Sequence, residues 1–579
     1  MARRPRRRTI LAFVATLVLV WLLAAAWMLL DAKSALDHGR TSLASVRNGA
    51  TPASLLDPET NTGLDAASQD FAHARSRLRS PVLTPLRVLP VIGRHVRAGD
   101  RVASSSLAAT ALASHAVRDL QELSERDLGA GPQRIEVLKD LTSVIDRTRE
   151  GLERLDPGSP DDLAGPLGDA VAKLDTERDE AVTSLARAAG TTTALAAVLN
   201  GPTPYLLIGA NNAEMRAGSG MFLSAATLGL DNGQLDLGDV RPTETLVLPA
   251  GSVPVTGDLA ANWPWLDSGR DLRNMALTAD FPQSAELAVK NWALVPGGAK
   301  VAGVIVVDVD ALRSLLRVVG PVEVGGVRYS ADTVRSELLR QQYRRFGADE
   351  GDRDQRRDQL GEVAKVVFDR LEAGDWKLAD LSSALLDSVQ RRNLLVWSAD
   401  PTIQKAWATT GADGHLRSGS LSVALLNRGA EKLDSYLDTT ATLTSKRTGA
   451  GRVEVSLAYR ITNKAPATGP RYLIGPNIAG MEAGEHRGIA VVNLPAGTDG
   501  IRLTGATQTL VGTDGPTAVV AGDLTLKRGE SITVRVTGTL PAGVDEVTLE
   551  PAARISRTVW TVNGTTYGID RRRTVTLGG

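Results

Sequence analysis

The apolar and polar positions divide the chain into four stretches with different periodicities. An uninterrupted apolar run covers residues 9–30. Between residues 31 and 200 the apolar positions recur every three or four residues, which predicts helices. Residues 201–400 mix short apolar runs with helical periodicity, and residues 430–579 alternate apolar and polar positions between Gly and Pro turns, as strands do.

These patterns predict a multidomain protein, as does a length of 579 residues, which is too long for one core. We expect a basic cytoplasmic tail at residues 1–8, a transmembrane anchor at 9–30, an all-α bundle of about four helices at 31–200, an α/β domain with a mixed sheet at 201–425, and an antiparallel β-sandwich at 430–579.

The run from Thr9 to Leu30 predicts a membrane-spanning helix. It contains no charge, and at a rise of about 1.5 Å per residue it can cross a hydrocarbon core of about 30 Å. The positive-inside rule keeps the N-terminus in the cytoplasm and places the bulk of the chain outside the cell membrane, as a single-pass signal-anchor protein. The arginines behind this prediction are Arg3, Arg4, Arg6, Arg7 and Arg8. A cleaved signal peptide is the alternative, although its apolar region usually has only about 7–15 residues.

A second apolar segment, residues 81–93, is punctuated by proline and joins two predicted helices. It could be a wedge at the membrane surface or a loop packed between the helices, and we favour the packed loop.

Two apolar β runs in the α/β region end in polar residues, as strands with a site at their C-terminal edge do. The run 205–209 precedes Asn211, Asn212 and Glu214, which could orient substrate hydroxyls or cap a following helix. The run 301–307 precedes Asp308 and Asp310. They resemble a metal pair, but we favour Asp310 as a helix N-cap and Asp308 as a structural hydrogen-bond acceptor.

Asp231-Asn232-Gly233 predicts a hairpin turn, because Asn-Gly accepts positive φ angles. Helices are expected at 284–292, 310–319, 330–342 and 355–371.

Composition removes several kinds of chemistry. The chain has no cysteine, which excludes disulfides and thiolate catalysis, and none of its six histidines lies in 201–400, which excludes a Ser-His-Asp triad or a His-ligated metal there. With 66 basic and 66 acidic residues the net charge is zero, so we expect no nucleic-acid partner. We assign no metal ligands and no catalytic residue. A magnesium ion is the one cofactor that we leave open.

Arginines gather where the predicted strands end and where the last of these helices begins. Such a set suits a phosphate or pyrophosphate group, although acidic neighbours also make a salt-paired surface plausible. The candidate phosphate-binding arginines are Arg216, Arg241, Arg344, Arg345, Arg353 and Arg356.

Several of these residues stand in motifs that resemble the LytR-CpsA-Psr family of envelope glycopolymer transferases. Val240-Arg241-Pro242-Thr243, the block from Val307 to Val324, and Gly351-Asp352-Arg353-Asp354-Gln355-Arg356 resemble three motifs of that family. The resemblance implies that the arginines hold the pyrophosphate of a polyprenyl-linked glycan. The chain departs from that family at Met221-Phe222-Leu223-Ser224, where Arg-Ser-Asp-Thr with its metal-placing aspartate is expected.

Residues 211–216, the loop 218–222 and Asp280-Phe281-Pro282 are also similar to an uncharacterised family of membrane-anchored proteins of Gram-positive actinobacteria, the domain of unknown function 4012 family. We therefore expect a cell-envelope protein that binds a polyprenyl-(pyro)phosphate-linked or phosphorylated glycan and that could be a glycopolymer transferase. The alternative is a non-catalytic scaffold with a degenerate transferase-like domain and cell-wall or envelope protein partners.

Overall fold

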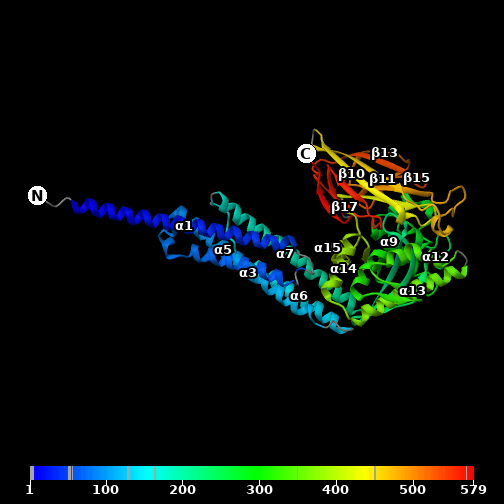
Figure 1. Ribbon diagram of the computed structural model, residues 1–579, viewed down its shortest axis with the longest axis horizontal. Helices are drawn as coiled ribbons and strands as arrows, with labels where there is room; N and C mark the ends of the chain where they lie inside the picture. Colours follow the sequence, from blue (N-terminus) through cyan, green and yellow to red (C-terminus); the bar gives the residue numbers. More distant parts are fainter. Residues whose placement is uncertain are drawn as a thin grey trace. The chain divides into compact units, whose positions relative to one another are not determined.

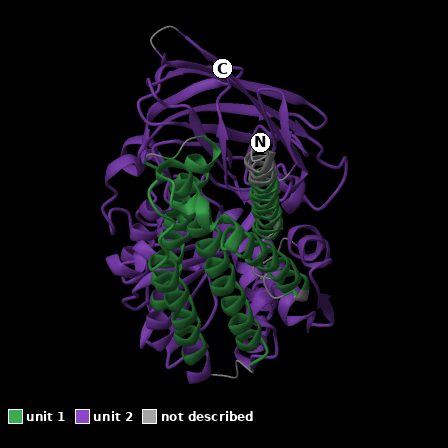
Figure 2. Cartoon of the chain, turned by 90° about the vertical axis from the view of Figure 1, so that its left-hand side faces the viewer, with its two compact units in different colours: residues 1–126, 136–193 green, residues 127–135, 194–579 purple. Residues whose placement is uncertain are grey.

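The computed structural model describes residues 5–49, 54, 57–126, 131–161, 163, 165–347, 350–448, 451–568 and 570–578. The chain forms two compact units, residues 1–126 with 136–193 and residues 127–135 with 194–579 (Figure 2). Arg3 and Arg4 of the predicted basic tail lie outside the described residues.

The first unit is helical, as the periodicity predicts. Small side chains let α1, α3 and α5 approach closely, with Ala32, Ala35, Ala74 and Ala103 buried in one core. Asp57 caps α3 by accepting a hydrogen bond from the Glu59 amide at 3.0 Å, and proline opens both α3 and α5. The elements are α1 (Pro5–Gly49), α3 (Pro58–Leu78), η1 (Pro81–Leu83), α4 (Thr84–Arg87), α5 (Pro90–Ser124), α6 (Pro132–Glu153) and α7 (Pro166–Asn200) (Figure 1).

Helix α1 contains the predicted anchor and continues beyond Leu30 as one helix of 45 residues. By length and composition, two helices in the described part of the chain could cross a membrane, in the stretches Thr16–Arg47 and Pro166–Asn200. The second is the less apolar of the two, and its last residues Val198 and Leu199 pack on the central sheet. The first is therefore the better candidate for a membrane span.

The second unit contains a six-stranded mixed sheet, which confirms that prediction. Its strand order is β3-β2-β1-β5-β8, with β4 beside β2, and β1 pairs in parallel with β5 while its other neighbour β2 is antiparallel. Asn232 (φ 48°) and Gly233 (φ 78°) form the predicted turn between β2 and β3. The strands are β1 (Thr203–Met215), β2 (Gly220–Asp231), β3 (Gln234–Leu237), β4 (Arg241–Pro242), β5 (Gly303–Asp308) and β8 (Leu394–Ser398).

The predicted helices of this unit are present, with one change in how they begin. Asp308, and not Asp310, caps α10, because its Oδ1 accepts from the amides of Asp310 and Ala311 at 2.9 Å each. Asp310 instead pairs with Arg335. The span predicted at 330–342 is broken into α11 (Val334–Ser336), a π-helical turn (Glu337–Gln341) and α12 (Gln342–Arg345). The other α-helices are α8 (Gly257–Asn262), α9 (Phe281–Trp292), α10 (Val309–Val319), α13 (Glu350–Ala373), α14 (Leu378–Gln390), α15 (Pro401–Thr410) and α16 (Arg471–Ile474).

The interpretation of Asn211, Asn212 and Glu214 as caps of a following helix is wrong. Strand β1 runs through these residues to Met215 and turns directly into β2, so no helix follows it. The polar residues therefore lie within the strand.

Two further six-stranded sheets follow, in the orders β13-β16-β11-β10-β18-β19 and β14-β15-β12-β9-β17-β20. Their inner faces share one core, which includes Leu443, Leu457, Val492 and Val520. The sheets are not purely antiparallel as predicted, since β10–β18 and β9–β17 are parallel pairs whose partners are far apart in the chain. The strands are β9 (Ser420–Asn427), β10 (Leu437–Arg447), β11 (Val453–Asn463), β12 (His486–Leu494), β13 (Asp499–Thr504), β14 (Thr507–Asp514), β15 (Thr517–Leu526), β16 (Ser531–Leu540), β17 (Glu546–Glu550), β18 (Val559–Val562), β19 (Thr565–Tyr567) and β20 (Arg573–Thr576).

The two faces of the central sheet have different surroundings. Side chains alternate along each strand, so Leu206 and Ile208 of β1 enter a core that also contains Leu426 of β9 and Val491 of β12. Leu207 lies on the opposite face, in a separate cluster with residues of α7, α13 and α15. The central sheet and the C-terminal sheets therefore share one continuous core on one face only.

Candidate ligand-binding cavity

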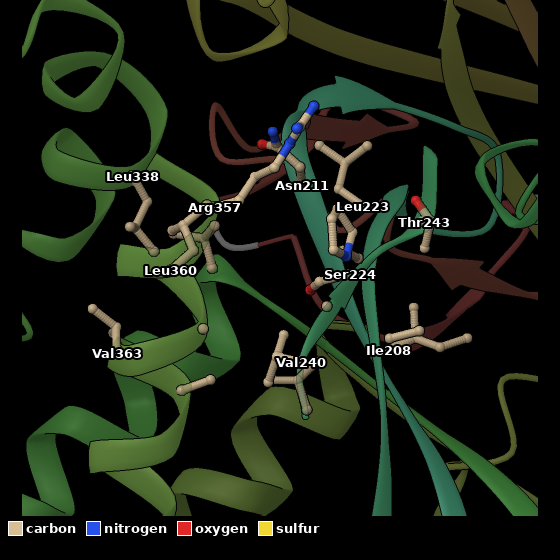
Figure 3. A pocket seen from close by; sticks show the side chains of 18 of the residues that line it. Ile208, Asn211, Leu223, Ser224, Val240, Thr243, Leu338, Arg357, Leu360 and Val363 are labelled. Carbon is tan, nitrogen blue, oxygen red and sulfur yellow. The ribbon is translucent and has the colours of Figure 1, made fainter. Parts of the chain in front are cut away.

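A cavity of about 380 Å³ lies between the central sheet and helices α10 and α13. In Figure 3, Leu360 and Val363 of α13 lie across the cavity from Leu223 and Ser224 of β2. Its volume is that of a small-molecule site. The apolar lining includes Leu207, Ile208, Met221, Leu223, Val240, Val307, Val309, Leu312, Leu315, Leu338, Leu360, Val363, Val367 and Phe368.

The local sequence explains why this space is not filled. Helix α13 presents Leu360, Val363, Ala364 and Val367 at the spacing of one helix face. The strands opposite carry small residues at the cavity, among them Gly209, Ser224 and Ala226. Gly209 cannot be enlarged without movement, because a Cβ atom there would lie 2.3 Å from Ser224 Oγ.

Six lining residues form a connected polar cluster at the cavity. Tyr343 is at its centre: its ring lies 5.7 Å from that of Tyr472, and its hydroxyl accepts a hydrogen bond from Asn211 Nδ2 at 3.3 Å. Burial raises the pKa of Tyr343, so its hydroxyl stays protonated. We call this set the polar cluster: Asn211, Glu214, Tyr343, Arg356, Lys432 and Tyr472.

Most cations that line the cavity already have an acidic partner. Lys432 forms a buried ion pair with Glu214, and although burial opposes the charged form, Glu214 raises the pKa of Lys432 overall. Arg273 donates from Nε and Nη2 to Asp271 at 2.7–3.1 Å. Arg357 pairs with Glu244 and, at 2.5 Å, with Asp354.

Arg356 differs from these three cations. Its side chain is buried, with a relative exposure of 7% for the residue, and its Nη1 has no hydrogen-bond partner among the described residues. Among the residues that the structure describes it makes no ion pair, and its guanidinium instead lies 5.2 Å and 5.0 Å from the ring centroids of Tyr343 and Tyr472. A buried charge without a counter-ion is costly, so Arg356 is a site where an anion would be stabilised.

The other candidate arginines do not meet at the cavity. Arg216 is buried and donates to the carbonyl oxygens of Met215 and Asn427, which ties β1 to β9. Arg241 donates to the carbonyl oxygen of Pro296. Arg345 pairs with Glu337, and neither Arg344 nor Arg353 lines the cavity.

Asn212 also has a structural place, since its amide donates to Asp308 and to the carbonyl oxygen of Ala553. Of the nine candidate site residues, the structure brings together Asn211, Glu214 and Arg356.

Sequence reasoning missed half of the polar cluster. Lys432 and Tyr472 belong to the region that was assigned to the β module, and no motif or spacing connects them with β1 or α13. Tyr343 directly precedes Arg344 and Arg345, and the sequence argument selected the two arginines and not the tyrosine. The site is therefore composite, because the C-terminal region completes a cavity that the α/β elements begin.

Asp308 lies at the inner wall of the cavity. Burial and the neighbouring Asp310 raise the pKa of Asp308 to about 7, and its carboxylate accepts from Asn212 at 2.8 Å and from Asn393 at 2.6 Å. No group of three or more His, Asp or Glu side chains in the described ranges is arranged to hold a metal ion.

Comparison with known proteins gives one match. Residues 200–343 match the family model of a protein of unknown function, DUF4012. This confirms the DUF4012 resemblance over that part of the chain. The matched part includes Asn211, Glu214 and Tyr343 but ends before α13, and so before Arg356, Lys432 and Tyr472. No curated protein and no solved structure matches the chain.

Proposed function

We propose that this protein is a membrane-anchored envelope protein that binds an amphiphile, with an apolar chain in the cavity and an anionic head group at Arg356. The observation that carries the proposal is the combination of an apolar cavity with a buried guanidinium that has no partner among the described residues. A phosphate would supply the missing charge and accept hydrogen bonds from Arg356 in a bidentate arrangement. The two tyrosine faces already hold the guanidinium in position.

A polyprenyl phosphate or pyrophosphate, free or linked to a glycan, fits this chemistry. It combines a long hydrocarbon chain with a charged head, and an anchored protein meets such a lipid in the membrane. The cavity has the volume of a small-molecule site, so only part of a long chain lies inside it. We place α1 across the cell membrane with the N-terminus in the cytoplasm. We also propose a LytR-CpsA-Psr-like fold for the α/β domain and a β-sandwich for the two C-terminal sheets.

Binding or presentation of the lipid is favoured over glycan transfer. Where the transferase family has Arg-Ser-Asp-Thr, this chain places Met221, Leu223 and Ser224 in the lining of the cavity. These residues supply neither a cation nor a metal-placing carboxylate at a leaving pyrophosphate. Magnesium dependence and the scaffold alternative, with its envelope protein partners, remain predictions.

The test compares two ligands of equal chain length, a polyprenyl phosphate and the uncharged polyprenol. Each is titrated against the full chain in detergent micelles. We expect the wild type to prefer the phosphate by at least about tenfold in Kd, or about 1.4 kcal/mol. Arg356→Met should remove the preference and leave polyprenol binding unchanged.

Arg353→Met is the matched control, since it removes the same group one turn earlier on α13, outside the cavity. It should behave like the wild type. An Arg356→Met protein that keeps the phosphate preference would contradict the proposed role of Arg356.

A further inference from the structure

Residues 80–93, which comprise the connection from α3 to α5 and the first turn of α5, lie against the C-terminal half of the predicted membrane span. Trp21 Nε1 of α1 donates a hydrogen bond to the carbonyl oxygen of Val82 at 2.9 Å. Leu83 and Leu86 are buried against Ala25, with Trp21 and Met28 packed beside them. We call residues 80–93 the tip segment.

The surface of the tip segment is apolar. Val88 is 81% exposed and Val91 66%, and Leu89 and Ile92 are exposed as well. Its only charged residue, Arg87, is turned back, because its Nη2 donates to the carbonyl oxygen of Leu78 at 2.8 Å and lies 3.5 Å from Asp100. The sequence favoured a packed loop over a membrane wedge; in the structure Leu83 and Leu86 pack, while Val88 to Ile92 face outward.

Charged residues of α1 and α3 pair at the far end of this apolar zone. Asp31 of α1 pairs with Arg77 at 2.7 Å and with His73 at 2.9 Å. The guanidinium of Arg77 lies 5.0 Å from the ring centroid of Trp27, which is exposed. Tryptophan and arginine are typical of the interface between lipid and water.

The depth of the tip segment follows from α1. Asp31 and Trp21 are ten residues apart, which is about 15 Å along the helix and about half of a hydrocarbon core of about 30 Å. If Asp31 lies at the interface, Val82 beside Trp21 reaches the middle of the membrane. The exposed apolar residues of the tip segment would then lie among acyl chains, continuous with exposed Leu19, Leu23 and Leu30 of α1.

We propose that the tip segment inserts into the membrane leaflet farther from the N-terminus, as a second membrane contact beside α1. Exposed apolar side chains of this kind are unfavourable in water and favourable among acyl chains. The insertion holds the α3–α5 connection against the membrane, so that a helix free to tilt and rotate becomes a fixed attachment. This inference rests on the proposed anchoring by α1.

Single cysteines test the inference, and because the natural chain has none they give no background. Leu19, Val88 and Val91 are each replaced by cysteine, as is exposed Ser143 of α6. Ser143 lies one turn from Arg147, which pairs with Asp119, and Asp119 is about 40 Å along α5 from Ile92. Each full-length protein carries an environment-sensitive fluorophore in phosphatidylglycerol–phosphatidylcholine vesicles.

Lipids with a nitroxide on the acyl chain should quench the labels at residues 19, 88 and 91 but not at 143, and aqueous iodide should do the reverse. If residue 19 is quenched by lipid while 88 and 91 behave like 143, the anchor stands and the insertion of the tip segment is refuted. If all four labels respond only to iodide, the anchor and the insertion both fail.

Discussion

The two faces of the central sheet are built from the same strands but are covered in different ways. On one face Leu206 enters a core that continues into the C-terminal sheets. On the other face Leu207, the next residue of the strand, borders a cavity of about 380 Å³ beneath α13. Neighbouring residues of one strand thus separate two tasks: one face joins the sheets, and the other leaves apolar surface free for a ligand.

The same contrast holds for the buried charges. Asp434, which joins the sheets, is fully satisfied: it accepts from the Met215 amide at 3.0 Å and from Arg554 at 3.1 Å. Arg356 at the cavity has no such acid among the described residues. Burial alone therefore does not show whether a charged residue stabilises the fold or binds a ligand. The partners of the charge show it.

Truncation of the filled face should have the largest effect. Leu206→Ala should lower the free energy of unfolding by about 4–5 kcal/mol, near the upper end for buried leucine, because closely packed neighbours cannot collapse into the space. Leu207→Ala should cost nearer 2 kcal/mol, since its side chain already borders empty space. Urea unfolding of both variants measures the difference. Equal losses would break the contrast between the faces.

Breaking the Lys432–Glu214 pair should be nearly as costly. Lys432→Met leaves the Glu214 carboxylate buried without its partner, and such changes cost about 3–5 kcal/mol. The double variant with Glu214→Gln should recover much of this loss. Arg356→Met should destabilise the protein much less, because it removes a buried cation that has no acidic partner among the described residues. Thermal unfolding of the three proteins makes the comparison, and a loss for Arg356→Met as large as that for Lys432→Met would show that Arg356 is structural.

Enlarging a side chain, from alanine to phenylalanine, should also distinguish the two faces. Ala285→Phe on α9 overpacks the filled core and should cost about 1–3 kcal/mol. Ala364→Phe on α13 projects into the cavity and should leave stability nearly unchanged while weakening polyprenol binding by at least about tenfold. Unfolding and lipid titration are measured on both variants. Unchanged binding by Ala364→Phe would show that the cavity is not the binding site.

The smallest expected effect is a pH dependence at His415. The hydrogen bond of 2.6 Å from its Nδ1 to Asp280 raises the pKa of His415 above its ordinary value of 6.5. The folded state therefore gains stability that is complete below pH 6.5 and is lost as the pH rises through the folded pKa. The side chain is partly exposed, so the fall in Tm should be slight. His415→Gln should flatten the Tm profile across this range, and an identical fall in the variant would rule out His415 as its cause.

Local patterns predicted the elements better than the site. The presence of β1, of the Asp231-Asn232-Gly233 turn and of α13 follows from periodicity and turn chemistry, although β1 ends at Met215 and not at Gly209. The roles of the polar residues do not, because each role depends on a partner far along the chain. Arg216 was predicted to bind phosphate, yet its guanidinium donates a hydrogen bond to the carbonyl oxygen of Asn427, 211 residues later. Glu214 meets Lys432, 218 residues later.

The helix α13 shows the limit most clearly. Arg353 and Arg356 are three residues apart, and both were predicted to bind phosphate. Only Arg356 lines the cavity. A three-residue step turns about 300° around a helix, so the two side chains are neighbours that still point in different directions. Which of them meets Tyr343 and Tyr472 was decided by tertiary packing, and Tyr472 comes from the C-terminal region.

Native mass spectrometry of the full chain, extracted gently from membranes of cells that make polyprenyl phosphates, tests the central claim most directly. We expect the wild type and Arg353→Met to carry a bound lipid whose mass includes phosphate, and Arg356→Met and Ala364→Phe to have lost it. Wild-type protein without a bound lipid, or the same phosphorylated lipid on Arg356→Met, would contradict the claim that the cavity and Arg356 together bind an anionic amphiphile.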